Sequence, residues 1–332
     1  MSTNKILIIL LFFLLQYPLT LFFTNDEDML YLPEEEKLLG IDGTEEIRKG
    51  RPVTLDELYG IIATPNSRSE ITKLKYGKTI FKTVTTIDQH GLRISTASHR
   101  PGKSKHLLLI DSSMVFGEGL NDDQTLSHII NLKSNKYEAY PIAFYGYGPQ
   151  QAWVRFKQEK LSSQVLENKG QAIFFTSEWD IWRFFGSLNT LYHTGEFPFI
   201  DEVSKGNFVH RGNFKNSGLW WQKLLINYCI PFLFCANFTS KIERRYLDDN
   251  QYSIIGRFFE DVERLYRKEF NVESFKIIFT GNSDEAQRLA QHTNIDVIPY
   301  LVTNEDSYVD GHLKPEPVIK LADFLFNTKL ID

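Results

Sequence analysis

The distribution of apolar and polar residues along the chain changes near Lys105. Beyond that point, short apolar runs alternate with longer stretches of helical character. The runs that predict strands are His106–Ile110, Tyr137–Phe144, Ala172–Thr176, Phe275–Thr280 and Ile295–Leu301. The helical stretches are Asp123–Leu132, Pro149–Lys160, Ile254–Phe270 and Val318–Phe326. Apolar strands that alternate with helices are typical of a parallel sheet covered on both faces, so we predict an α/β fold. Ligands of such sheets bind beyond the carboxyl ends of the strands.

Pro141 makes Tyr137–Phe144 an unusual strand, because proline cannot donate a hydrogen bond to a neighbouring strand.

A β-rich segment precedes this region. Residues Ile71–Ile94 contain many β-branched side chains, and turn-forming residues interrupt them at Asp88–Gly91. The pattern predicts two β-segments joined by that turn as a β-hairpin. Residues 26 to about 60 are acidic, and we expect a short helical piece at Leu55–Tyr59. The chain therefore divides into an N-terminal segment (1–25), an extension with the β-hairpin (26–105) and an α/β domain (106–332).

The N-terminal segment contains a long run without charge. Ile6–Asn25 has no charged side chain, Lys5 precedes it, and Asp26 follows it. Such a run can cross a hydrocarbon layer of ~30 Å, and Lys5 favours a cytoplasmic N-terminus. No small-x-small cleavage site follows, but a cleaved signal peptide is the alternative. Both interpretations place the rest of the chain outside the cytoplasm, either anchored at the periplasmic side of a membrane or secreted.

Composition limits the classes of partner. The 332 residues are 14% aromatic, which a disordered chain could not carry exposed. The net charge is −5 and the basic residues are scattered, so we predict no nucleic-acid partner. The only cysteines, Cys229 and Cys235, are expected to be buried thiols, or bonded to each other if the chain is exported. The histidines show no metal-ligand spacing, so we predict no metal and no cofactor.

One candidate nucleophile follows the first predicted strand. The sequence there reads Asp111-Ser112-Ser113, with Phe116-Gly117-Glu118-Gly119 just beyond. A serine directly after a buried strand and before a glycine-containing turn is well placed for nucleophilic attack. Taken alone, such a serine is also a common helix N-cap.

Two further segments carry candidate chemistry. Asp310-Gly311-His312 precedes the last predicted helix, and a histidine close to a carboxylate can act as a general base. An exposed loop histidine is the alternative. Gly146 follows the second strand, where its backbone N–H could face a developing oxyanion. A plain strand-to-helix turn would have the same composition.

In their order and positions, these motifs resemble the SGNH (GDSL-like) hydrolase family. The resemblance spans roughly residues 74 to 326, and the stretch Leu74–Gly119 is also similar to bacterial members with an N-terminal anchor. It implies a flavodoxin-like three-layer fold with a mostly parallel five-stranded sheet in the order 2-1-3-4-5. Aligned on Phe116-Gly117, the family's nucleophile falls on Ser113, with Asp111 and Ser112 in place of its usual Gly and Asp. Ser112 is the alternative if the alignment is made on Asp-Ser.

The resemblance also assigns the remaining roles. The family's Asp and His fall on Asp310 and His312, and Gly146 with the backbone N–H of Ser113 would form the oxyanion hole. The family's third motif supplies an Asn, but this chain has Ser177–Arg183 there, without an Asn. A carboxylate aimed at an oxyanion would repel it, so we expect either another donor or weak activity. Asp180 and Arg183 can instead pair on one helical face.

The resemblance implies a serine esterase or O-acyltransferase that acts on an extracytoplasmic acyl ester of a small molecule, lipid or glycan. The alternative is a catalytically silent relative that binds a glycan or lipid, which the altered first motif and the missing Asn would explain.

Overall fold

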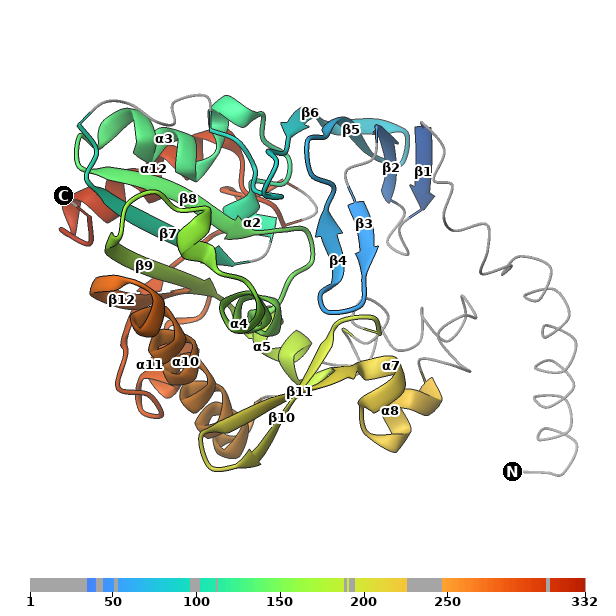
Figure 1. The fold of residues 1–332 in the computed structure, drawn as a ribbon. Coiled ribbons are helices and arrows are strands. Elements are labelled where there is room, and N and C mark those ends of the chain that lie inside the picture. Colours follow the sequence, from blue (N-terminus) through green and yellow to red (C-terminus); the bar gives the residue numbers. More distant parts are fainter. Residues whose placement is uncertain are drawn as a thin grey trace, which may run out of the picture.

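The centre of the molecule is a five-stranded sheet in which all neighbouring strands are parallel (Figure 1). The computed structural model describes residues 35–39, 44–50, 53–95, 102–111, 113–187, 190, 195–225, 247–308 and 311–331. The strands are β7 (Lys105–Asp111), β8 (Tyr137–Ala143), β9 (Lys169–Thr176), β12 (Asn271–Thr280) and β13 (Asp296–Tyr300). They lie in the order β13-β12-β9-β7-β8. All five predicted strands are confirmed, as is the predicted order 2-1-3-4-5.

The topology explains how a proline fits into β8. Pro141 lies opposite Leu109 of β7, and β8 is the edge of the sheet. An edge strand pairs on one side only, so the missing N–H of a proline is tolerated there.

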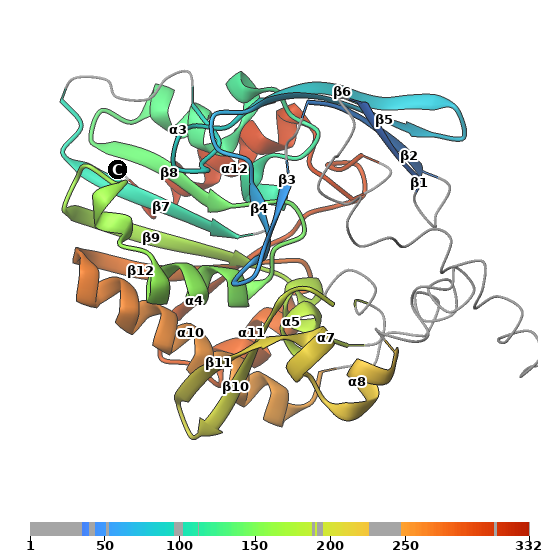
Figure 2. The same cartoon turned by 45° about the vertical axis from the view of Figure 1, so that its right-hand side comes forward.

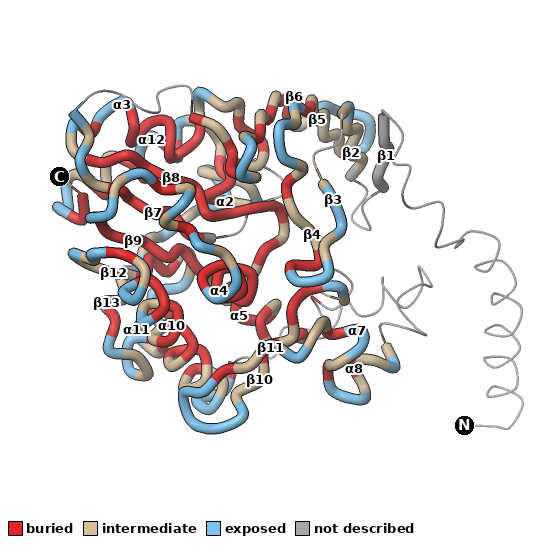
Figure 3. The backbone as a smooth tube through the Cα atoms, in the orientation of Figure 1, coloured by how far each residue is buried: buried red, intermediate tan, exposed pale blue. Residues whose placement is uncertain are grey.

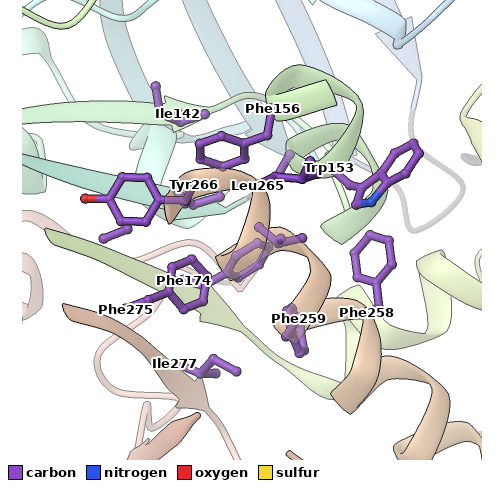
Figure 4. Packing of buried hydrophobic residues seen from close by; sticks show 14 of the residues in the cluster. Ile142, Trp153, Phe156, Phe174, Phe258, Phe259, Leu265, Tyr266, Phe275 and Ile277 are labelled. Atoms are coloured by element: carbon purple, nitrogen blue, oxygen red, sulfur yellow. The ribbon is translucent and has the colours of Figure 1, made fainter. Parts of the chain in front are cut away.

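Helices cover both faces of the sheet. Alternate residues of each strand point to opposite faces, and both sets contain apolar side chains that pack against helices. On one face Leu107 and Leu109 pack with residues of α2 (Ser113–Phe116), α3 (Leu126–Lys133) and α12 (Pro315–Asn327). On the other face Leu108 and Ile110 pack with residues of α4 (Pro149–Gln158), α5 (Glu178–Phe185), α10 (Asp249–Glu269) and α11 (Ser283–Ala290). Part of this second core is drawn in Figure 4, and burial is nearly continuous along β8 and β9 in Figure 3. Short 3-10 turns lie at Asp122–Gln124 and Leu161–Ser163.

The extension forms β-structure on the side toward which the central strands point (Figures 1 and 2). Four antiparallel strands lie in the order β1-β2-β5-β6, with bounds Glu35–Leu39, Thr44–Lys49, Arg68–Lys75 and Lys78–Thr86. A separate ribbon pairs β3 (Val53–Asp56) with β4 (Gly60–Ala63).

One prediction for the extension needs correction. The expected helical piece at Leu55–Tyr59 is wrong, because its first residues pair in β3 and the carboxylate of Asp56 accepts the N–H groups of Leu58 and Tyr59 in a turn.

The predicted hairpin turn at Asp88–Gly91 is present, and the pairing across it is short. Arg93 forms an antiparallel bridge with Ile87, and the N–H of Ile94 donates to the carbonyl of Thr86 at 3.0 Å. The long partner of β6 is β5, which the sequence analysis did not separate from it.

A hairpin of β10 (Pro198–Ser204) and β11 (Asn207–Asn213) was not predicted. Glu202 on it accepts two hydrogen bonds of 2.7 Å from Arg257 of α10. The short helices α7 (Phe214–Ser217) and α8 (Trp220–Leu224) follow.

The run Ile6–Asn25 and both cysteines, Cys229 and Cys235, lie outside the described residues. Within the part of the chain that is described, no helix is both long and apolar enough to span a membrane.

Candidate functional site

The structure brings Ser113 and His312 into contact although 199 positions separate them in the sequence. Ser113 begins α2 immediately beyond β7, so it lies at the carboxyl edge of the sheet. His312 lies in the loop before α12, which reaches the same edge. The distance from His312 Nε2 to Ser113 Oγ is 3.0 Å, within hydrogen-bonding range. This is the arrangement that a serine nucleophile and its general base require, and the catalytic roles of the two residues stay predictions.

The loop that carries His312 is folded back on itself. The N–H of Tyr308 donates to the carbonyl of His312 at 2.7 Å, and Ser307 forms a bridge with Leu313. Gly311 has φ +93° and donates to the carbonyl of Tyr308 at 2.9 Å. Only glycine adopts this conformation readily, so the Gly within Asp-Gly-His has a local structural cause.

Two of the predicted residues cannot be placed. Asp310, the expected orienting carboxylate, and Ser112, the alternative nucleophile, lie outside the described residues. Their roles stay predictions. For Asp111 the structure describes the backbone of β7 only.

A carboxylate that the sequence analysis quoted but did not single out also contacts His312. Glu118 Oε2 lies 3.0 Å from His312 Nε2, the same atom that contacts Ser113. The other oxygen of Glu118, Oε1, accepts from Lys73 Nζ at 3.4 Å. Glu118 stands between two glycines in the turn that follows the nucleophile, which is the sequence signal that could have identified it.

Gly146 lies in the turn after β8, beside α2. Its φ of +68° lies in the left-handed region that favours glycine. The ring of the preceding residue, Tyr145, packs on Phe116 of α2 with centroids 4.4 Å apart. Arg183 of α5 donates to the carbonyl of the next residue, Tyr147, at 2.9 Å. The turn is therefore held from both sides, and the role of Gly146 as an oxyanion donor stays a prediction.

The predicted pair of Asp180 and Arg183 is confirmed, with Arg183 Nη1 3.2 Å from Asp180 Oδ1. The other oxygen of Asp180 accepts from the backbone N–H of Ser177 at 2.9 Å and from its hydroxyl at 2.6 Å. This buried carboxylate caps the N-terminus of α5, so both of its oxygens already have donors. The negative charge at the position of the family's Asn is thereby neutralised locally.

A buried arginine of the extension supports the nucleophile's turn. Arg93 is 2% exposed, and its guanidinium donates to the carbonyls of Phe116 at 2.9 Å, Gly117 at 2.6 Å and Leu120 at 2.6 Å. Its Nε also donates to Asp122 at 3.1 Å. The sequence analysis missed this residue. The sequence feature that could have identified it is a cation between two apolar residues, Leu92 and Ile94.

No cluster of three or more metal-ligating side chains occurs among the residues that the structure describes. The chain matches no protein-family model and no curated protein. Solved structures similar to it include a mutant of the PilB minor pilin from Streptococcus sanguinis. That structure is 8% identical in sequence, the match covers 85% of this chain and 78% of the pilin, and the TM-score is 0.26. A likeness this weak carries no functional argument.

Proposed function

We propose that this protein is a serine-dependent ester hydrolase or O-acyltransferase of the SGNH type, with a flavodoxin-like fold. The observation that carries the proposal is the 3.0 Å contact between Ser113 Oγ and His312 Nε2 at the carboxyl edge of the parallel sheet. Ligands of sheets with this topology bind at that edge.

The reaction follows from the two side chains. His312 Nε2 accepts the proton of Ser113, whose Oγ attacks the ester carbonyl and forms a tetrahedral intermediate. The backbone N–H groups of Ser113 and Gly146 would stabilise its oxyanion. The protonated imidazole then gives its proton to the leaving alcohol, and an acyl-enzyme remains. Water or a second alcohol then attacks the acyl-enzyme and releases the acyl group by the same steps in reverse order. Asp310 orients the imidazole in both halves of the reaction.

The location in this proposal comes from the sequence. The uncharged run Ile6–Asn25 would anchor the chain in a membrane, or be cleaved as a signal peptide, and leave the catalytic domain outside the cytoplasm. The resemblance to SGNH hydrolases supplies the substrate class, an extracytoplasmic acyl ester of a glycan or lipid, and implies no cofactor.

One observation favours a second candidate, a catalytically silent protein that binds a glycan or lipid. Glu118 and Ser113 both contact Nε2 of His312, and one ring nitrogen carries at most one hydrogen. If Nε2 always donated to Glu118, it could not take the proton of Ser113.

A fluorophosphonate probe separates the two candidates, because only an activated serine forms a covalent adduct with it. We expect labelling of the wild-type chain and turnover of a short-chain aryl ester, and we expect Ser113→Ala to abolish both. Loss of a nucleophile lowers the rate by several orders of magnitude, whereas Ser112→Ala should retain most of the activity.

The outcomes are distinct. Activity that survives in Ser113→Ala but not in Ser112→Ala would shift the nucleophile by one residue. A wild-type chain with neither labelling nor turnover would contradict an enzymatic function and leave the silent candidate.

A further inference from the structure

The backbone fixes the position of Glu118 next to the nucleophile. Its N–H donates to the carbonyl of Ser113 at 3.0 Å, and its neighbours Gly117 and Gly119 have φ +83° and +82°. A Cβ atom on Gly119 would lie 3.1 Å from the ring of Tyr308 and 3.2 Å from that of Phe81. The turn is therefore confined between two aromatic side chains, which keeps the backbone of Glu118 in place beside Ser113.

The two oxygens of Glu118 have different neighbours. Oε1 accepts from Lys73 of β5 at 3.4 Å, and Oε2 faces His312 Nε2 at 3.0 Å. The side chains of Glu118 and Lys73 are 13% and 12% exposed, so solvent screens this pair only weakly. Arg48 of β2 is a further cation whose charge interacts with Glu118. The extension thus holds a carboxylate within reach of the general base.

This placement matters for the second half of the proposed reaction. The acceptor alcohol must bring its O–H to Nε2 of His312, which takes the proton while the oxygen attacks the acyl carbon. An acceptor at Nε2 therefore lies beside Oε2 of Glu118. Both O–H groups of a water molecule start from one oxygen, and acceptors only 3.0 Å apart are too close together to receive both with good geometry. A molecule with two adjacent hydroxyls makes both, one O–H to Nε2 and the other to the carboxylate.

We propose, on the basis of the proposed function, that Glu118 selects a polyhydroxylated acyl acceptor and so favours transfer over hydrolysis. One hydroxyl of the acceptor donates to Oε2 of Glu118, which leaves the lone pair of Nε2 for the reacting hydroxyl. The bond between Ser113 Oγ and the acyl carbon breaks as the new ester bond forms. The proton taken from the acceptor passes from Nε2 to Ser113 Oγ, so atoms and charge balance.

The surrounding charges favour a neutral acceptor. Lys73 contacts Glu118 and Arg48 pairs with Glu46, so two cations already balance the two carboxylates and leave no excess negative charge to attract a cationic amine. A neutral diol or sugar can donate a hydrogen bond to the charged carboxylate of Glu118 without bringing a further positive charge. Hydrogen bonds to charged groups are stronger than those between neutral groups.

The experiment measures how the acyl group is divided between acceptors. An aryl acetate serves as donor, and glycerol and 1-propanol compete separately with water for the acyl-enzyme, with the esters quantified by mass spectrometry. In the wild type we expect glycerol to be acylated at least about tenfold more efficiently than 1-propanol, because the additional bond involves a charged group. We expect Glu118→Ala to remove this preference, and the isosteric Glu118→Gln to retain a part of it.

Glu316→Ala is the matched control, because Glu316 is an exposed carboxylate of α12. It should keep the wild-type ratio of glycerol to propanol esters. An unchanged ratio in Glu118→Ala, including one with faster hydrolysis because Glu118 merely restrained His312, would overturn the inference and leave the proposed function intact. A wild-type chain that neither reacts with the fluorophosphonate nor cleaves the donor would overturn both.

Discussion

Arg93 shows how one side chain can hold a turn that lies more than 20 residues away in the sequence. Its guanidinium donates to three buried carbonyls between Phe116 and Leu120, and its Nε donates to the partly buried carboxylate of Asp122. A planar group with five N–H donors suits this set, whereas an ammonium on a flexible stem does not.

We therefore expect Arg93→Met to lower the free energy of unfolding by about 3–5 kcal/mol, because it removes the cation that pairs with Asp122 and a donor from each of the three carbonyls. Arg93→Lys should recover only part of the loss. Urea unfolding measures both. The control is Arg211→Met, which removes a half-exposed pair with Asp201 and should cost no more than about 1 kcal/mol. Equal midpoints for Arg93→Met and the wild type would contradict this role.

Among individual residues, the sequence could predict only those that belong to a recognisable motif. Ser113 and His312 were identified from their positions after a strand and before a helix, and the structure brings them together. Glu118 was not identified, because the direction of its side chain depends on the positive φ of Gly117 and Gly119. The contacts of Arg93 are with carbonyl groups, which every residue has, so no sequence pattern indicates them.

Among the helices and strands, α10 contains a glycine at a position where helix propensity favours alanine. Gly256 lies in the middle of this 21-residue helix, where alanine is more favourable by about 1 kcal/mol. A Cβ at this position would overlap the backbone carbonyl of His292, just beyond α11. The helix therefore approaches the neighbouring segment more closely than any side chain permits.

Because the obstacle is backbone, we expect Gly256→Ala to be destabilising by about 1–3 kcal/mol, as for overpacked cores, rather than stabilising. Thermal unfolding gives the sign. Lys268→Ala, at an exposed position of the same helix, should stay within about 0.5 kcal/mol of the wild type. A higher melting temperature for Gly256→Ala would show that the contact with His292 is loose.

The predictability of elements follows the range of the interactions that form them. Strands β7, β8 and β9 are apolar and buried on both faces, so their composition alone indicates them. In contrast, β2 reads Thr-Glu-Glu-Ile-Arg-Lys and owes its conformation to pairing with β1 and β5. Strand preference depends strongly on such context. The strands of the extension could therefore not be separated before their partners were known.

In the whole molecule, the extension and the α/β domain share the candidate site. Lys73 contacts Glu118, the N–H of Val84 donates to the side chain of Asn121 at 2.9 Å, and that of Thr86 donates to Asp122 at 3.1 Å. These contacts cross the boundary near residue 105 that the sequence analysis drew. The composition changes at that boundary, but the packing of the nucleophile's turn depends on residues from both sides of it.

A buried polar cluster lies near the start of β7, at the end of the strand opposite Ser113, and connects the sheet with two other segments. His106 is fully buried, with Nδ1 2.6 Å from the carbonyl of Glu167 and Nε2 2.6 Å from the hydroxyl of Tyr266 in α10. A neutral imidazole satisfies both, donating from Nδ1 and accepting at Nε2. Burial lowers the pKa of His106 from 6.5 to about 4.

The unfolded chain therefore binds a proton at His106 between pH 6.5 and about pH 4, whereas the native chain does not. The free energy of unfolding should fall as the pH decreases through this window, by up to about 1.4 kcal/mol per pH unit and about 3 kcal/mol in all from this residue. Above pH 6.5 the contribution is absent, and below pH 4 the loss is complete. Urea unfolding of the wild type and His106→Gln from pH 4 to pH 8 tests this. The two curves should run parallel above pH 6.5, and the variant should lose less stability below it, whereas equal slopes throughout would mean that His106 is protonated in the folded protein.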